Sequence, residues 1–363
     1  YNGWLNITTE QGERRIGIER IHIEEDAGKL LHGENGTLID CNRCGVPLIE
    51  IVSAPDMRSP EEAAAYVKKL RSVLLYTGVS DGKMQEGSLR CDVNLSVRKI
   101  GTDVLGTRTE LKNINSYAFM MKAISYEYNR QVAVLESGGE ILQETRRYDQ
   151  ANGKTVSMRK KEEAQDYRYF PEPDIPPIYV SREMVQKLLS QIPELPDARM
   201  ARYRELYALS EYDAASLTAG KTVADFFESA VRYTSFPKHL AHLITGELFR
   251  KLPADPAPED MPKNPVDFGK IAEMLGSGKI NSATAKRLVG EVLQHEIDPI
   301  GYVREHGLEQ INNEAELRPI VCRVITEYPK ILADYYEGKT AALKALMGKA
   351  ISQTQGRGNP EVI

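Results

Sequence analysis

The sequence predicts an α+β protein in which a domain of mixed strands and helices is followed by a region of helices alone. Up to about residue 180, short runs of alternating polar and apolar residues, typical of half-buried strands, accompany two long helical segments. Residues 170–177 are rich in proline and cannot form a regular element, because proline lacks an amide donor and fixes φ. Only helical patterns follow this stretch.

The first domain is expected to combine several strands with two helices. Ser59, which precedes a proline and two glutamates, has the pattern of a helix N-terminus and predicts a helix over residues 60–75. Ser116 begins a second helix, which is expected to end at the glycine pair 138–139. Alternation or an apolar run predicts strands at residues 14–18, 20–24, 46–52, 88–97 and 107–111.

The C-terminal region is expected to consist of helices with one longer interruption. Residues 253–265 hold five prolines and indicate a linker or a long loop. At roughly 150 residues per domain, the chain length predicts two or three domains. Helices are expected at residues 182–191, 197–206, 211–217, 219–233, 239–251, 266–276, 282–295, 299–306, 314–328 and 332–353.

The composition restricts the class of protein. A net charge of −5 over 363 residues argues against a nucleic-acid binder held by a global basic field, although local patches or shape leave such a partner open. No apolar run approaches the ~18 residues of a membrane span, so no membrane protein is expected. Four cysteines do not make a disulfide framework, which favours a reducing cytoplasm. Because Tyr1 is not an initiator methionine, we expect an N-terminal piece to be missing.

Acidic side chains stand at the end of one strand and inside another. In residues 20–29, His22 and Glu24 face one side of the strand, while Glu25 faces the other. Three consecutive acids followed by Lys29 indicate a hard-cation site beside a phosphate-binding lysine, or else a solvated strand end. Glu50 interrupts an apolar run, and a buried carboxylate needs either a salt bridge or a metal ion.

Two further strands carry polar side chains on one face. Residues 85–97 alternate so that Arg90 and Asp92 share a face with other polar residues, while the opposite face is apolar. Glu110 and Lys112 flank an apolar residue in the same way. Because this face mixes arginine with acids, it is better suited to a nucleotide and a metal ion than to plain solvent.

Other catalytic patterns are absent or incomplete in the sequence. Neither a Walker phosphate-binding loop nor the serine motif of a hydrolase occurs, so a P-loop ATPase and a serine amidase are not supported. Cys41 and Cys44 form a single C-x₂-C pair without a second pair. Zinc at Cys41 and Cys44 would need ligands from a missing segment.

Five long motifs resemble those of one family. They resemble the B subunit of the aspartyl/glutamyl-tRNA amidotransferases, and the match continues through residues 195–199 to 358–360. The resemblance implies a cradle-like α+β catalytic domain, then a helical domain, then a small helical tail that contacts tRNA. The boundaries expected from the residues, near 190 and 305, suit this layout and give domains at 1–190, 191–305 and 306–363. The motifs occupy residues 21–29, 45–53, 86–92, 109–113 and 166–174.

The resemblance also implies a reaction and partners. Members of this family transfer the γ-phosphate of ATP to the side-chain carboxylate of Glu-tRNA(Gln) or Asp-tRNA(Asn), with Mg²⁺ as the metal ion. Ammonia, which the partner amidase (the A subunit) makes from glutamine, then displaces the phosphate, and a small third protein (the C subunit) joins the two. A misacylated tRNA is thus an expected partner, and a membrane is not.

The family motifs imply roles for particular residues. Glu25 and Glu50 correspond to metal ligands, and Glu110 to a third. The face arguments add Lys29, Arg90, Asp92 and Lys112 as contacts of the nucleotide or substrate. The family begins with a strand that carries an acid and a histidine, and this segment is absent, so the metal site is expected to be incomplete. The family supplies no zinc ligand role for Cys41 or Cys44.

Two other functions compete with the kinase hypothesis. A non-catalytic tRNA-binding and assembly subunit fits the charge, but it has no use for acids within apolar strands. A free-standing carboxylate–amine ligase for a small substrate has little use for the helical C-terminal third.

Overall fold

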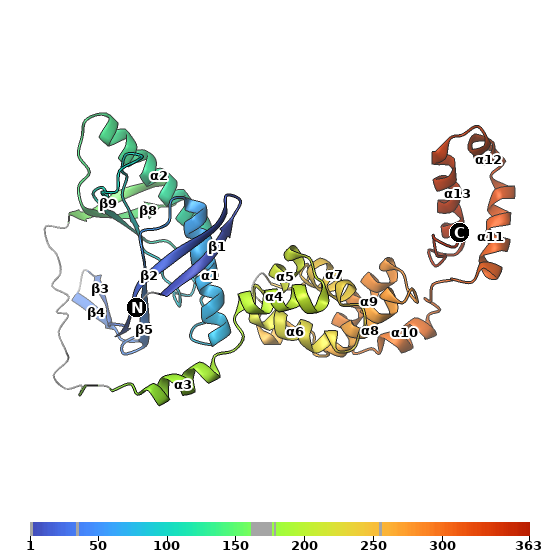
Figure 1. Cartoon of the computed structure of the whole chain (residues 1–363), viewed down its shortest axis with the longest axis horizontal. Helices are drawn as coiled ribbons and strands as arrows, with labels where there is room; N and C mark the ends of the chain where they lie inside the picture. The colour runs from blue at the N-terminus through green and yellow to red at the C-terminus, as the bar shows by residue number, and fades with distance from the viewer. Residues whose placement is uncertain (1–2, 34–35, 161–175, 178, 254–255) are drawn as a thin grey trace. The chain divides into compact units, whose positions relative to one another are not determined.

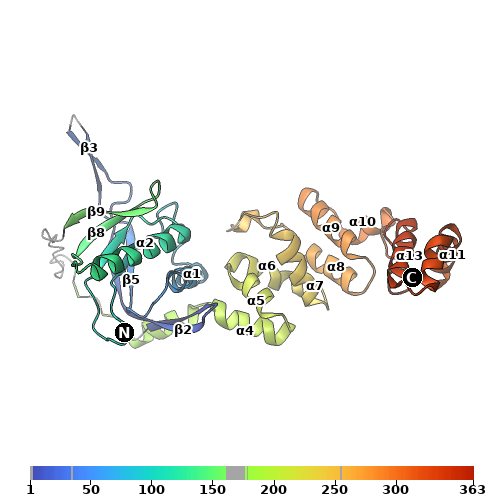
Figure 2. The same ribbon diagram turned by 90° about the horizontal axis from the view of Figure 1, so that it is seen from above.

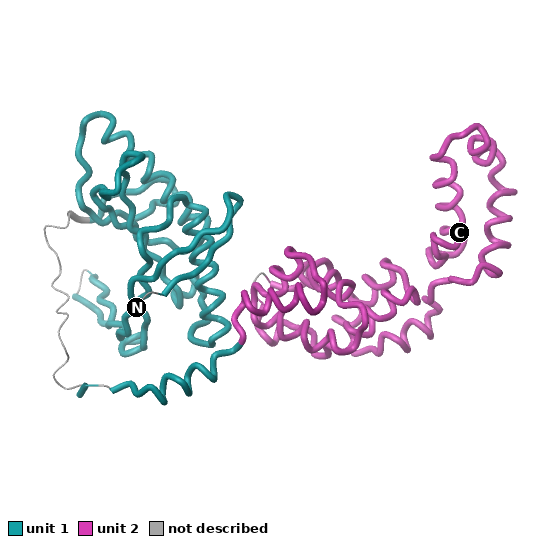
Figure 3. The backbone as a smooth tube through the Cα atoms, viewed as in Figure 1, with its two compact units in different colours: residues 1–193 teal, residues 194–363 magenta. Residues whose placement is uncertain are grey.

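The computed structural model describes residues 3–33, 36–160, 176–177, 179–253 and 256–363. They fall into two compact units, Tyr1–Pro193 and Glu194–Ile363 (Figures 1 and 3). The first unit combines sheets with helices, and the described part of the second has helices as its named elements, which confirms the α+β class. The motif at 166–174 and most of the proline-rich stretch lie outside the described residues.

A three-stranded antiparallel sheet opens the first unit, in the order β1 (Gly3–Thr9), β2 (Gly12–Glu25) and β5 (Pro47–Ser53). The runs 14–18 and 20–24 belong to one long strand, whose pairing shifts between Ile18 and Arg20. Ile16 is fully buried, as expected for a half-buried strand. The same expectation is wrong for residues 20–25, which are exposed, because the core under α1 covers only the first part of β2.

A hairpin and a second sheet complete the strands. β3 (Lys29–Gly33) and β4 (Gly36–Asp40) form the hairpin, which extends away from the rest of the unit (Figure 2). The second sheet has the order β6-β7-β8-β9, with only β7 and β8 parallel. A parallel pair needs a crossover, and α2 supplies it. The bounds are β6 (Val93–Leu95), β7 (Thr109–Lys112), β8 (Glu144–Asp149) and β9 (Lys154–Lys160).

The two predicted helices of the first unit are confirmed. α1 (Pro60–Thr77) begins where the Ser59 hydroxyl accepts a hydrogen bond from the Glu62 amide, and it ends at Gly78, whose φ of 71° suits glycine. α2 (Tyr117–Glu136) begins at Ser116, whose hydroxyl accepts from the Phe119 amide. α3 (Arg182–Gln191) follows later in the unit. α1 and α2 pack with the sheets around a core that includes Ile7, Ile16, Leu111, Met120 and Tyr148.

The second unit follows the predicted helices with two differences. The helix expected at 332–353 is two helices, because the chain turns at Gly338, which has a φ of 88°. The helix expected at 239–251 becomes α7 followed by a π-helical turn, η1 (Leu243–Leu248). The helices are α4 (Pro196–Tyr207), α5 (Glu211–Thr218), α6 (Lys221–Val231), α7 (Pro237–His242), α8 (Pro265–Gly276), α9 (Ser282–Gln294), α10 (Pro299–Glu305), α11 (Glu314–Glu327), α12 (Pro329–Tyr336) and α13 (Thr340–Gln353).

The second unit contains two apolar clusters. α4 to α10 surround the larger one, which includes Phe227, Leu240, Ile244, Phe268 and Leu288. The segment 256–264 includes a 3₁₀ turn, η2 (Pro258–Asp260), and its Met261 packs against this cluster, so it serves as a loop of the unit. α11 to α13 share a smaller cluster around Val324, Leu346 and Ala350. Within the described part of the chain, no helix is long and apolar enough to cross a membrane.

Candidate functional site

The pairing of β2 with β5 decides which acids share a face. His22 lies opposite Glu50, and Glu24 lies opposite Leu48. Because side chains alternate along a strand, His22, Glu24 and Glu50 face the same side of the sheet, and Glu25 faces the other side. The structure therefore brings Glu24, rather than Glu25, to the face of Glu50.

Glu50 is exposed, so the expectation of a buried carboxylate is wrong. Its apolar neighbours are exposed as well: Ile49 keeps 40% and Ile23 keeps 85% of its surface accessible. No desolvation cost therefore forces a counter-charge on Glu50. An exposed carboxylate keeps its oxygens available to an incoming ligand.

Asp26, the third of the consecutive acids, connects three segments. Its Oδ2 accepts from Arg43 Nε at 2.7 Å and lies 3.3 Å from Arg90 Nη2. Arg43 also donates to the Gly87 carbonyl at 3.4 Å, so the turn after β4 is tied to the stretch before β6. The hydrogen bond from Arg43, with the charge of Arg90, holds the pKa of Asp26 below its usual value. The sequence pattern predicts neither of these contacts.

Arg90, the partner of Asp26, lies two residues before Asp92, which belongs to a second group of charges. The strand predicted at 88–97 is regular only over β6, yet the alternation holds: Leu89 and Cys91 are partly buried, while Arg90 and Asp92 are exposed. The Cys91 thiol contacts Met120, and burial raises the pKa of Cys91 to about 11. Cys91 is therefore an inert core residue, and its neighbours on either side carry the charges.

Asp92, Lys112 and Glu110 meet on the open face of the second sheet. Lys112 Nζ donates to Asp92 Oδ2 at 2.7 Å and lies 3.3 Å from Glu110 Oε1. The other oxygen of Glu110 accepts from the Thr145 hydroxyl at 2.8 Å. Burial alone would lower the pKa of Lys112, but its bonds to the two carboxylates outweigh burial and raise that pKa. Lys112 therefore keeps its positive charge at neutral pH.

The remaining candidates, Lys29, Cys41 and Cys44, make no contact that the structure records with Asp92, Lys112 or Glu110. Lys29 is exposed at the start of β3, opposite Asp40 of the same hairpin. Cys41 and Cys44 are exposed in the turn after β4, where the Cys44 amide donates to the Cys41 carbonyl at 3.0 Å. Nowhere in the described residues do three or more His, Cys, Asp or Glu side chains form a group that could hold a metal ion. Glu25, Glu50 and Glu110 are accordingly not assembled as a trio.

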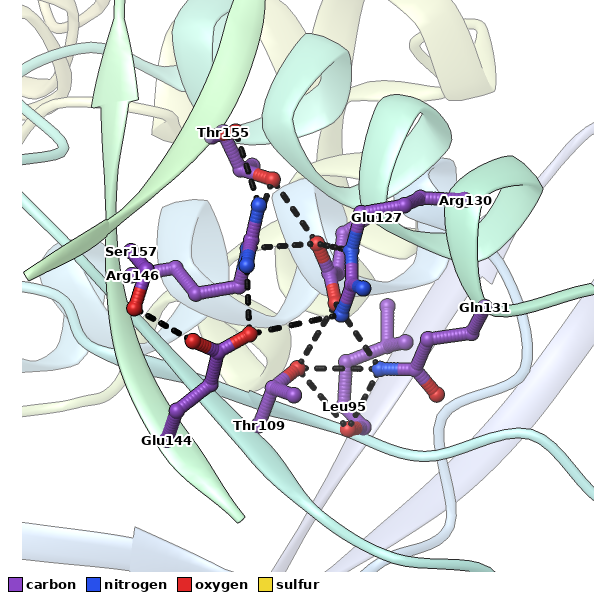
Figure 4. A network of polar contacts seen from close by, with 9 residues as sticks. All are labelled: Leu95, Thr109, Glu127, Arg130, Gln131, Glu144, Arg146, Thr155 and Ser157. Carbon is purple, nitrogen blue, oxygen red and sulfur yellow. Dashed lines mark hydrogen bonds and ion pairs between the residues drawn. The ribbon is translucent and has the colours of Figure 1, made fainter. Parts of the chain in front are cut away.

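A buried polar network lies on the opposite face of the second sheet, under α2 (Figure 4). Glu127 of α2 is fully buried and accepts from Thr109 of β7 at 3.0 Å and from Thr155 of β9 at 2.8 Å. It also pairs with Arg146 of β8 at 3.2 Å and with Arg130 at 2.6 Å. Burial would raise the pKa of Glu127, but its hydrogen bonds lower it, so this carboxylate stays ionised.

The network has further members that sequence reasoning did not identify. Gln131 donates to Glu127 at 3.0 Å and to Thr109 at 2.9 Å. Glu144 accepts from both Arg146 and Ser157. The only signal in the sequence is the spacing of Glu127 and Gln131, which places two polar side chains on the buried face of a helix.

These geometries define what the first unit offers to a ligand. Asp26 and Arg90 form one ion pair, and Asp92, Lys112 and Glu110 form a second group that begins two residues further along the chain. We call these five charged side chains the row. Arg90 is the most exposed cation of this row, with 63% of its side chain accessible, so most of its donors are available. Guanidinium and ammonium groups bind phosphate, and the exposed carboxylates on the β2–β5 face suit a hard cation.

Comparisons with known proteins cover the whole chain. Residues 1–186 match a family model described as the GatB/GatE catalytic domain, and residues 225–363 match one described as the GatB domain. Three similar curated proteins are each named as the B subunit of aspartyl/glutamyl-tRNA(Asn/Gln) amidotransferase. The protein of Carboxydothermus hydrogenoformans is 48% identical over 100% of this chain and 76% of its own length.

The other two give the same result. The protein of Caldicellulosiruptor saccharolyticus is 47% identical over 100% of this chain and 77% of its own length. The protein of Caldanaerobacter subterraneus subsp. tengcongensis is 49% identical over 99% of this chain and 76% of its own length. With both halves matched and identity near one half, the chain belongs to the family of aspartyl/glutamyl-tRNA(Asn/Gln) amidotransferase B subunits.

Proposed function

We propose that the first unit of this chain phosphorylates the side-chain carboxylate of Glu-tRNA(Gln) or Asp-tRNA(Asn) with ATP. As a member of the B subunit family, the chain is part of a tRNA-dependent amidotransferase, a glutamine-dependent carbon–nitrogen ligase. A carboxylate oxygen of the aminoacyl group attacks the γ-phosphorus, and ADP leaves. Ammonia then attacks the acyl phosphate, loses a proton, and displaces inorganic phosphate to leave the amide.

The observation that carries this proposal is the row of charges from Asp26 to Glu110. Phosphoryl transfer demands positioning and cations that neutralise the charge of the transferring group. Arg90 and Lys112 supply those cations, and each is oriented by a carboxylate partner at 3.3 Å or less. Glu110, whose two oxygens contact Lys112 and Thr145, fixes the ammonium group of Lys112. Lys29 is a further phosphate contact at the start of the hairpin.

The chemistry of the exposed acids fits Mg²⁺. Mg²⁺ takes one or two carboxylates and completes its coordination with water and substrate phosphates. Glu50 would hold it together with an acid from the end of β2, either Glu24, which shares the face of Glu50, or Glu25, which the family motif favours. The ion would neutralise phosphate charge during the transfer. Zinc at Cys41 and Cys44 stays a prediction that requires two further ligands.

The partners follow from the same proposal. Ammonia comes from the amidase (the A subunit), a small third protein (the C subunit) completes the complex, and the misacylated tRNA is bound with the help of the helical tail at 306–363. Residues 1–190 form the cradle, and residues 191–305 form the helical domain that precedes the tail in the sequence. A cytoplasmic location agrees with four free cysteines and with a reaction on aminoacyl-tRNA.

The test reconstitutes the full protein with its amidase and small partner subunits. Charged tRNA, Mg²⁺ and γ-labelled ATP are supplied without an ammonia donor, and label leaving ATP is followed. We expect turnover that requires both Mg²⁺ and the misacylated tRNA, and we expect Lys112→Met to reduce it by about 100-fold. The matched change Lys221→Met, on α6 in the second unit, should leave turnover unchanged.

The same experiment tests the alternative of a non-catalytic assembly subunit. Turnover that does not exceed the control with uncharged tRNA would favour that alternative. In that case the acids and cations of the row would serve only as salt bridges.

A further inference from the structure

Helix α2 is hydrogen-bonded to β7, the strand that carries Glu110 and Lys112, on the buried face of the sheet. Thr109 precedes Glu110 directly, and its hydroxyl is 3.0 Å from Glu127 Oε1 on the buried side of the sheet. Thr109 is fully buried, as is Glu127. Side chains alternate along β7, so a shift of Thr109 on one face moves Glu110 and Lys112 on the other.

The same carboxylate also holds the two strands beyond β7. Its second oxygen contacts Arg146 of β8 at 3.2 Å and Thr155 of β9 at 2.8 Å (Figure 4). Arg146 follows Thr145, a buried residue whose hydroxyl donates to Glu110 at 2.8 Å. One buried side chain thus fixes both strands that contribute to the Glu110–Thr145 hydrogen bond.

The parallel pair β7–β8 needs such support because it is short. Its register spans only Glu110↔Thr145 to Lys112↔Arg147. Two acids and two arginines, Glu127, Glu144, Arg130 and Arg146, balance each other in the network. Buried ion pairs of this kind seldom add much stability over apolar packing, but they favour one defined arrangement. The network around Glu127 is therefore expected to fix the position of β7 and β8 rather than to add much stability.

We propose that Glu127, through its hydrogen bond to Thr109, is a positioning residue that sets the place of Lys112 and Glu110 in the phosphoryl-transfer site. The proposal rests on the function proposed above and deepens it. Glu127 does not touch the substrate, since it lies on the far side of the sheet. It fixes β7 so that the Lys112 ammonium group meets the transferring phosphate.

The chain offers a matched pair of variants. Thr109 and Thr155 are both buried threonines that donate to Glu127, but only Thr109 lies on the strand with Lys112. Thr109→Val and Thr155→Val each remove one hydroxyl at nearly constant volume. Both leave the charges of Glu127 and its arginines in place, whereas Glu127→Gln removes one of the two carboxylates that Arg130 and Arg146 share and risks misfolding.

The experiment measures kcat and KM for ATP in the charged-tRNA-dependent reaction of the reconstituted complex, together with the thermal midpoint. We expect both variants to lower the midpoint by similar amounts. Thr109→Val should reduce kcat about tenfold, less than the 100-fold that a 1 Å misplacement costs, with KM for ATP within about twofold. Thr155→Val should keep kcat within about twofold of the parent.

A double variant separates the positioning role from the site itself. If Thr109 acts through Lys112, adding Thr109→Val to Lys112→Met should cause little further loss of kcat. Equal kcat losses in Thr109→Val and Thr155→Val, or full additivity with Lys112→Met, would overturn the positioning role and leave the proposed function standing. An unchanged rate in Lys112→Met would instead remove the proposed site.

Discussion

The guanidinium of Arg90 lies 3.3 Å from the carboxylate of Asp26, although 64 residues separate them in the sequence. This contact joins the acidic end of β2 to the segment that leads through Asp92 to Lys112. The end of the first sheet and the segment that precedes the second sheet are thereby joined by a direct ion pair. Arg90 keeps most of its side chain exposed, so the pair orients the guanidinium without using up its donors.

Replacing Arg90 tests that relationship. Arg90→Gln removes a charged hydrogen-bond donor, which is worth about 1.5–3 kcal/mol when its partner is a phosphate. We expect kcat/KM for ATP to fall about 10- to 100-fold in the reconstituted complex. Arg108→Gln, a matched change near β7, is the control. Equal effects of the two changes would count against a specific role for Arg90.

Glutamate substitutions at the β2–β5 face identify the acid that acts with Glu50. Glu50→Gln is expected to abolish Mg²⁺-dependent phosphoryl transfer while the partner's glutaminase activity continues. Because Glu24 shares the face of Glu50, Glu24→Gln should be as damaging, and Glu25→Gln should have the smaller effect. The measurement is the Mg²⁺ dependence of label transfer for each variant. If the Glu50→Gln variant transamidates at the wild-type rate, Glu50 has only a structural role.

Glu228 makes the stability of the second unit depend on pH. Burial would raise its pKa, but hydrogen bonds from Arg199 at 2.7 Å, Arg202 and Tyr203 lower that pKa from 4.5 to about 2. Because the pKa of Glu228 is lower in the folded state than in the unfolded chain, its ionised form stabilises the fold at any pH above the unfolded pKa. This stabilisation disappears as the pH falls from about 4.5 towards 2. Glu228→Gln should therefore flatten the decline of stability over this interval.

Denaturant unfolding at pH 7 and between pH 4.5 and 2 checks this prediction. At pH 7 the Glu228→Gln variant should lose about 1.5–3 kcal/mol, the range for a hydrogen bond to a charged group. Stability curves that run parallel for wild type and variant across the acid range would contradict it.

Truncation after residue 311, which removes α11 to α13, tests the helical part of the tail. α11 to α13 have their own small cluster around Val324 and Leu346, while α4 to α10 keep theirs without it. We therefore expect the truncated chain to remain folded by circular dichroism, with a higher KM for the charged tRNA. An unchanged KM would exclude a tRNA-binding role for the tail.

Local signals in the sequence explain why the helices were predictable. Ser59 and Ser116 cap α1 and α2 through their own hydroxyls, within three residues of the amides they bind. The break at Gly338 was not predicted, because a glycine inside a helical pattern does not by itself distinguish a tolerated residue from a helix end. The buried network around Glu127 was missed for another reason: its partners come from three strands that only the fold brings together.

The sequence by itself determined the α+β class, the alternation of residues 89–95, and the family, since each depends on local pattern or on long motifs. Tertiary structure decided which acid stands beside Glu50, because the pairing register of β2 and β5 selects Glu24. It also decided that Glu50 is exposed, because the core under α1 ends before that half of the sheet. Contacts such as Asp26–Arg90 and Thr109–Glu127 join distant segments, and no periodicity in the sequence encodes them.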